Sequence, residues 1–101
     1  MSDAISAADL VAQEAEYAAS VARDEVSLSV KRSRLVSWRY MNGLATAAEA
    51  EAAIRDVMAA RQNYLTAALD ADGAVIVRLL ALEEDRQARE AALESAPKET
   101  P

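Results

Sequence analysis

The chain has 101 residues and a formal net charge of -6, and it contains neither cysteine nor histidine. A chain of this length forms a single domain, and its acidic balance argues against nucleic-acid binding, which needs a concentrated basic surface. The missing residue types exclude disulfides, thiol redox chemistry, a structural zinc site and a histidine base. Hydrophobic residues make up 52% of the sequence but aromatic residues only 4%, with no phenylalanine. We therefore expect an all-α protein built from long, coiled-coil-like helices.

The first predicted helix spans about residues 4–41. Two heptad rows predict a coiled-coil seam with a polar middle. This predicted seam consists of Ala7, Leu10, Glu14, Tyr17, Val21, Asp24, Leu28, Lys31, Leu35 and Trp38. A second apolar set, at Val11, Ala18, Val26, Val30 and Val36, lies off this seam and indicates a second neighbour. Asp24 and Lys31 either fix the register and oligomeric state or face solvent.

The segment "NGLAT" interrupts the helical pattern at residues 42–46. Gly43 tolerates the left-handed conformation that ends helices, so Asn42-Gly43 predicts a helix stop. Thr46 and Glu49 then have the spacing of a capping box, which predicts a helix start. A stop followed so closely by a start predicts an antiparallel helical hairpin.

The second predicted helix spans about residues 47–92 and continues through Gly73. One row holds Ile54, Val57, Arg61, Tyr64, Ala68, Ala71, Val75 and Leu82, and another holds Met58, Leu65, Leu69, Ile76 and Leu80. The segment "EEDRQARE" predicts a solvated, charge-paired helix end. The hairpin is therefore expected over residues 1–93, with a polar, proline-containing, disordered tail at 94–101.

No residue pattern predicts catalysis, a cofactor or a metal site. A catalytic triad needs a base that this chain lacks, and its two glycines stand apart rather than in a phosphate-binding loop. The longest apolar run, "AVIVRLLAL" at 74–82, is interrupted by Arg78 and is too short to span a bilayer. The N-terminus has no recognisable secretory signal, which predicts a cytoplasmic location.

From the turn onward the sequence resembles the second long hairpin of the TolC-like outer-membrane efflux factors. The resemblance rests on Arg39-Tyr40, Gly43, Thr46, Glu49, "AARQNYL" at 59–65, Asp70, Ala74 and "VRLLAL" at 77–82. It covers about residues 17–82. The family implies side-by-side hairpins in a trimeric α-barrel, whose periplasmic tip docks the helical hairpins of an adaptor protein.

The resemblance assigns roles to residues near the turn. Gly43, Leu44 and Thr46 would form the adaptor-docking turn, Tyr40 would match a tip tyrosine of the gate, and Glu49 would match a pore-lining acid. The chain departs from the family at Ala45, where some members carry arginine, and it has neither a signal peptide nor β-strands. The resemblance therefore implies an isolated tip hairpin, located at the periplasmic side of the outer membrane.

Several alternatives remain open at this stage. Trp38 is either an exposed hot spot for a partner or packs across the hairpin on Ile54 or Val57. Gly43 and Thr46 either belong to a docking surface or serve only to end one helix and begin the next. Besides the export hairpin, the sequence allows an autonomous hairpin that dimerises into a four-helix interaction module. A small secreted hairpin of the Trp-x-Gly type ranks last, because Trp38 and Gly43 are too far apart for that motif. All these alternatives predict protein partners, including further copies of the chain.

Overall fold

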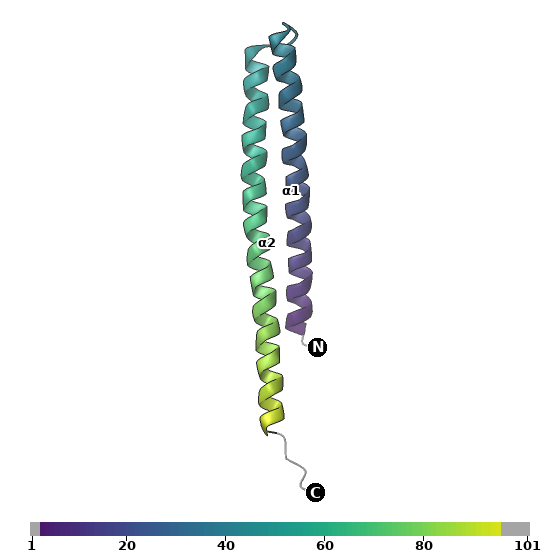
Figure 1. Ribbon diagram of the computed structural model, residues 1–101, viewed down its shortest axis with the longest axis vertical. Coiled ribbons are helices and arrows are strands. Elements are labelled where there is room, and N and C mark those ends of the chain that lie inside the picture. Colours follow the sequence, from purple (N-terminus) through teal and green to yellow (C-terminus); the bar gives the residue numbers. More distant parts are fainter. Residues whose placement is uncertain (1–2, 96–101) are drawn as a thin grey trace.

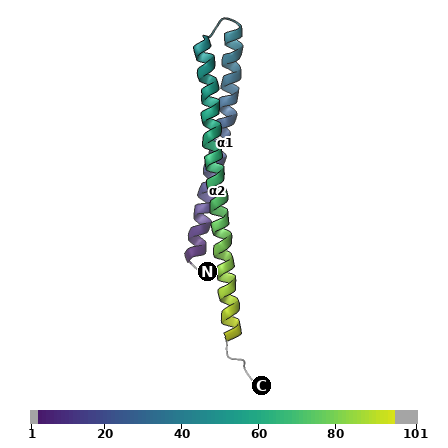
Figure 2. The same ribbon diagram turned by 90° about the vertical axis from the view of Figure 1, so that its left-hand side faces the viewer.

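The computed structural model describes residues 3–95, which form two long α-helices joined by a short turn. Helix α1 spans Asp3–Met41 and helix α2 spans Ala47–Ser95. The two helices run antiparallel and side by side along their length (Figures 1 and 2), and no strand occurs within the described residues. The predicted all-α antiparallel hairpin is therefore confirmed. Because α2 has 49 residues and α1 only 39, the end of α2 extends past the start of α1 (Figure 1).

The second helix is longer than the sequence predicted. It passes through Gly73 without interruption, as expected, but it ends at Ser95 rather than near residue 92. Glu94 and Ser95 thus belong to the helix and not to the predicted tail. The rest of that tail, residues 96–101, lies outside the described residues.

The turn at 42–46 is held by backbone hydrogen bonds at the end of α1. The Leu44 N–H donates to the Arg39 carbonyl at 2.7 Å, and the Gly43 N–H donates to the Tyr40 carbonyl at 3.1 Å. Gly43 has a φ of 71°. This combination is a Schellman motif, which satisfies carbonyls that the helix end would otherwise leave free. The predicted stop at Gly43 is confirmed.

The start of α2 is held by the predicted capping box. The Glu49 N–H donates to Thr46 Oγ1 at 3.1 Å, and the Thr46 N–H points back to Glu49 Oε1 at 3.5 Å. Two side chains thus satisfy backbone donors at the helix start. Because a complete stop and a complete start fit into the segment 42–46, the chain reverses direction in the shortest distance that both caps allow.

The contact between the helices is made mostly of alanine and serine. The residues of this inner seam are Ile5, Ala8, Ala12, Ala15, Ala19, Ala22, Val26, Ser29, Ser33 and Val36 of α1, and Ala50, Ala53, Val57, Ala60, Tyr64, Ala67, Ala71, Ala74, Arg78 and Ala81 of α2. All of them are buried or half-buried, and each set keeps a regular heptad spacing. Small side chains let two helices approach closely, because interaxial distance depends on the side chains at the contact.

The seam predicted for the first helix does not face α2, since the inner seam lies two residues away from it. Its members Leu10, Leu28 and Leu35 are exposed. Of the second apolar set, Val26, Val30 and Val36 are half-buried. The prediction favoured large apolar side chains, whereas the close approach of the two helices selects small ones.

Large apolar side chains instead form a stripe on the outer side of each helix. The outer stripe of α1 consists of Leu10, Tyr17, Val21, Leu28, Leu35 and Trp38, and the outer stripe of α2 consists of Met58, Leu65, Leu69, Ile76 and Leu80. Every one of these residues is exposed. The hairpin thus keeps its small residues inside and presents its large ones to its surroundings.

One ion pair joins the two helices in the described part of the chain. Arg78 Nη1 lies 3.4 Å from Asp9 Oδ1. Arg78 occupies an inner-seam position, and its Nε is buried without a hydrogen-bond partner. The pair fixes the relative height of the helices near the open end of the hairpin.

Candidate protein-binding surfaces

The tip of the hairpin carries the residues that the sequence singled out for partner binding. Trp38 and Tyr40 lie in the last turn of α1, Gly43 and Leu44 lie in the connection, and Thr46 begins α2. All of them are exposed, as is Glu49. The fold therefore gathers the six candidate residues at one end of the molecule.

Three of the tip candidates have an architectural role. Gly43 provides the left-handed residue of the Schellman motif, and Thr46 and Glu49 form the capping box. These residues set the shape of the tip. The Leu44 N–H takes part in the Schellman motif, but the Leu44 side chain has no such role and is 68% exposed. Leu44 thus has one of the tip side chains that are free to contact a partner.

Sequence reasoning missed Met41. Its side chain is 82% exposed, the most of any large hydrophobic residue in the described chain. It directly precedes the Asn42-Gly43 stop, where α1 has already left the cover of its partner helix. Together with Leu44 it makes the end of the tip apolar. The available signal was a large apolar residue immediately before a helix stop.

Trp38 does not belong to the inner seam, and of its two alternatives the structure favours the exposed one. Its side chain is 57% exposed, which does not support packing across the hairpin on Ile54 or Val57. Trp38 instead continues the outer stripe of α1 toward the tip. An exposed tryptophan in an apolar stripe is typical of a protein-binding hot spot.

The outer stripes face away from the hairpin on both sides. The inner-seam residues of α1 can be taken as the first and fourth positions of a heptad. The stripe of α1 then occupies the third and sixth positions, which lie on the opposite side of the helix. The residues of the α2 stripe lie at the second, third and sixth positions of their own heptad. A partner helix that covers either stripe would extend the hairpin into a row of helices. A compact four-helix bundle would need both stripes on the same side of the hairpin.

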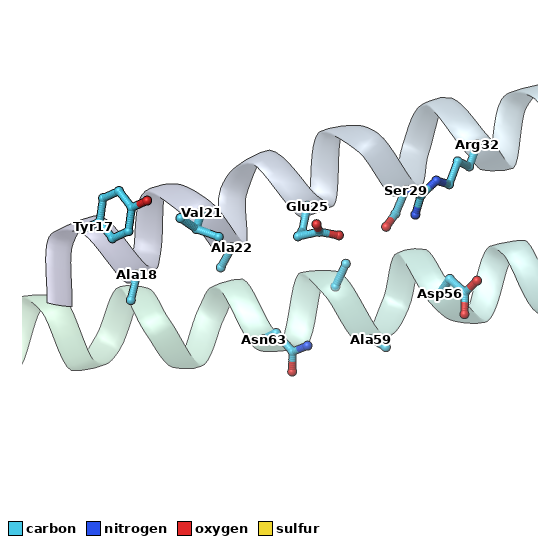
Figure 3. A pocket seen from close by; sticks show the side chains of 11 residues that line it. Tyr17, Ala18, Val21, Ala22, Glu25, Ser29, Arg32, Asp56, Ala59 and Asn63 are labelled. Atoms are coloured by element: carbon cyan, nitrogen blue, oxygen red, sulfur yellow. The ribbon is translucent and has the colours of Figure 1, made fainter. Parts of the chain in front are cut away.

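A groove of about 600 Å³ runs between the helices on one side of the hairpin (Figure 3). Its floor is made by alanines of both helices, including Ala22 and Ala60, and Glu25, Arg32 and Asp56 contribute charge. The groove lies against the two helices and is open to solvent on its other side, whereas small-molecule sites bury most of their ligand's surface. The groove follows from the small residues of the seam, and we assign no ligand to it.

The overhanging end of α2 carries its own charge network. Arg86 pairs with Glu83 and Glu90, and Arg89 Nε lies 2.9 Å from Asp85 Oδ2. The hydrogen bond from Arg86 lowers the pKa of the Glu83 carboxyl below its usual value. The predicted charge-paired helix end is confirmed. These pairs support the part of α2 that α1 does not cover.

Two kinds of site were sought in the described residues, a metal site and a membrane-spanning helix. No group of three or more acidic side chains is arranged to hold a metal ion in the part between Asp3 and Ser95. Neither helix, over these residues, has a stretch apolar enough to cross a lipid bilayer.

Comparison of the chain with protein families, curated proteins and solved structures finds no match. The TolC-like resemblance therefore remains a hypothesis based on the motif around the turn.

Proposed function

We propose that this chain is a non-catalytic helix-docking protein, whose function is to bind other helices. The observation that carries the proposal is the distribution of side-chain sizes between its surfaces. Mostly small residues occupy the inner seam, and most of the large apolar residues of both helices are exposed. Soluble monomers rarely expose extended apolar patches, and such patches mark sites of protein interaction.

The specific form that we propose is docking of a second helical hairpin at the tip, as the TolC-like resemblance implies for an adaptor protein in export. Exposed Leu44 and Met41 supply apolar contacts at the end of the turn. The Schellman motif and the capping box hold that turn in a single shape. A preformed turn binds with a smaller loss of conformational entropy than a flexible one.

A binding measurement with a purified adaptor hairpin from a TolC-type efflux system tests the proposed docking at the tip. We expect saturable binding to the wild-type chain and a loss of at least about tenfold in affinity for Leu44→Asp, since a charge would be buried in an apolar contact. Leu93→Asp is the matched control, because Leu93 is similarly exposed but lies at the far end of α2. Circular dichroism should show equal helicity in both variants.

Two outcomes would contradict docking of an adaptor hairpin at the tip. Equal affinity of the two variants would place the docking surface away from the tip. No binding of the wild-type chain would contradict a role in docking this adaptor.

The second candidate function is an autonomous assembly module that acts through the outer stripes. The observation that favours it is their length, since both stripes continue far from the tip, to Leu10 on α1 and to Leu80 on α2. Docking at the tip alone would leave most of this apolar surface uncovered. Self-association measured by light scattering would support the module.

A further inference from the structure

We propose that the outer stripe of α1 binds the same stripe of a second copy of this chain, in antiparallel orientation, around a twofold axis that passes between Ala22 and Arg23. This inference rests on the proposed helix-docking function and names the partner of one docking surface. The stripe identifies its own partner, because its residues are complementary to the same residues of a second copy that runs in the opposite direction.

The stripe has the spacing of a coiled-coil seam over more than four heptads. Together with Ala7, Glu14, Asp24 and Lys31, which lie on the same side of the helix and are counted in the stripe from here on, its residues recur at three- and four-residue intervals from Ala7 to Trp38, a length of about 47 Å. Within the single hairpin this surface faces away from α2, and all of its large apolar residues are exposed. It therefore provides a complete and uncovered helix-binding face.

The polar residues of the stripe favour one register. Around the proposed axis the opposing pairs are Ala7 with Trp38, Leu10 with Leu35, Glu14 with Lys31, Tyr17 with Leu28, and Val21 with Asp24, each occurring twice. Apolar residues thus meet apolar residues, the smallest side chain meets the largest, and Glu14 meets the opposite charge of Lys31. Only the central layer combines a charged residue with an apolar one, and such a polar residue in a seam can specify register.

Neighbouring registers are worse. A shift of one heptad in one direction places Glu14 against Asp24, which brings like charges together. The opposite shift places Lys31 against Val21 and Asp24 against Leu28, which buries charges on apolar partners. A parallel pair in register would place Glu14 against Glu14 and Lys31 against Lys31. The antiparallel register around the proposed axis avoids every like-charge layer and confines the contact of a charge with an apolar residue to the central layer, Asp24 with Val21.

The charges of the whole helix agree with this orientation. The half of α1 at the open end, up to the axis, carries Asp3, Asp9, Glu14 and Glu16 and no basic residue, whereas the tip half carries Arg23, Lys31, Arg32, Arg34 and Arg39 against the two acids Asp24 and Glu25. Antiparallel pairing places each acidic half beside a basic half. Within the described residues, neither Glu14 nor Lys31 forms an ion pair in the single hairpin, so both are available to the second copy. Complementary charge selects partners and orientation.

Packing of α1 on α2 of the next copy, with all tips pointing the same way, is less favourable. The Asp9–Arg78 pair shows which parts of the two helices lie at the same height. By this register Glu14 is level with Gly73 and lies beside Asp72, so the acidic half of α1 would meet another acid. The antiparallel pair avoids that contact and leaves a tip free at each end of the dimer.

Charge exchange tests the register. Glu14→Lys and Lys31→Glu should each weaken the dimer, measured by sedimentation equilibrium, by at least about tenfold in dissociation constant, because each reversal creates two like-charge contacts. The double variant Glu14→Lys/Lys31→Glu should recover to within about threefold of the wild-type value, since it restores both pairs. Glu16→Lys is the matched control and should leave the dimer unchanged. Glutamate and lysine have nearly equal helix propensities, so helicity should be constant through the series.

Disulfide crosslinking tests the orientation, which is simple in a chain without cysteine. Leu10→Cys and Leu35→Cys variants should crosslink when mixed and oxidised, and neither should crosslink alone. Crosslinking of Leu10→Cys with itself would show a parallel pair and overturn the inference. An oligomer without either crosslink would show a different interface; the inference would fail while the helix-docking function would stand. A helical monomer at all concentrations would also overturn the inference, and the adaptor-hairpin measurement would then decide the proposed function separately.

Discussion

The two glycines of the chain occupy opposite backbone environments. Gly43 has a φ of 71°, whereas Gly73 lies inside α2. A Cβ atom added at either position would meet nothing within 4 Å. The effect of a substitution at each site therefore depends on backbone conformation and not on packing.

The same substitution should change stability in opposite directions at these two sites. Gly43→Ala should lower the free energy of unfolding by about 1–2 kcal/mol, since an L-residue is strained in the left-handed region. Gly73→Ala should raise it by about 1 kcal/mol, because alanine is the better residue in a helix interior. Urea denaturation of both variants at one protein concentration measures the two effects. An unchanged Gly43→Ala variant would show that the turn can end α1 without the left-handed residue.

At the scale of the helices, the inner seam depends on the smallness of its residues. Ala12 has a relative exposure of 0%, the lowest in the described chain. A larger side chain there would push α1 away from α2, because a packed contact leaves no space for added methylene groups. The seam therefore differs from an ordinary leucine-rich coiled coil, in which large residues fill the contact.

We expect Ala12→Leu to destabilise the hairpin by about 1–3 kcal/mol, although leucine is a good helix former. Ala88→Leu is the matched control; Ala88 is exposed on the overhanging end of α2, and the change should stay within about 0.5 kcal/mol. Chemical denaturation followed by circular dichroism compares the two. A gain in stability from Ala12→Leu would mean that the helices can separate without loss, which would contradict the close inner seam.

The overhang of α2 should respond to acid. Because the folded-state pKa of Glu83 is lowered by its hydrogen bond from Arg86, this pairing contributes stability above the usual carboxyl pKa of 4.5. The contribution is lost as the pH falls through the lowered value. We expect residues beyond Glu83 to fray below about pH 4.5, with the remainder of α2 still helical, as residue-resolved NMR shifts would show. In Glu83→Gln the acid-dependent part of this fraying should be smaller; an identical pH profile would contradict the role of the carboxylate.

The two helices and their ends at the turn could be predicted because they depend on local rules. Gly43 stops a helix and Thr46 starts one in any context that leaves the backbone free to form the caps. The seam could not be chosen in the same way, since α1 contains two heptad frames offset by two residues. Hydrophobicity alone favoured the frame of Leu10 and Leu28. The tertiary contact favoured the frame of Ala12 instead, because the short turn brings the two backbones close together.

For the candidate site, the location at the tip could be predicted but the details of its surface could not. Position relative to the turn placed Tyr40, Leu44 and Trp38 at the tip, because a hairpin has only one closed end. The position of Trp38 on an outer stripe could not be derived, since it depends on which side of α1 faces α2. Met41 was missed for another reason, because its signal, a large apolar residue just before the stop, was local.

At the scale of the whole molecule, the inner seam provides limited stabilisation. Burying a leucine contributes about 1.5–3 kcal/mol, and burying an alanine contributes much less because its side chain is a single methyl group. A two-helix chain already buries a small share of its surface. The large apolar residues that would supply most of the hydrophobic free energy are those of the outer stripes. Their contribution becomes available only when a partner covers them, so folding and assembly should be coupled.

If folding is coupled to assembly, the melting temperature depends on protein concentration. For a dimer, a hundredfold increase in concentration should raise Tm by about 5–10 °C, because association stabilises only the folded chain. The Glu14→Lys variant should lose most of this dependence, whereas Glu16→Lys should keep it, since only Glu14 lies on the outer stripe of α1. Thermal melts by circular dichroism over that concentration range provide the measurement. A wild-type Tm that is high and independent of concentration would show that alanine packing alone holds the hairpin, and the outer stripes would then contribute to binding without contributing to folding.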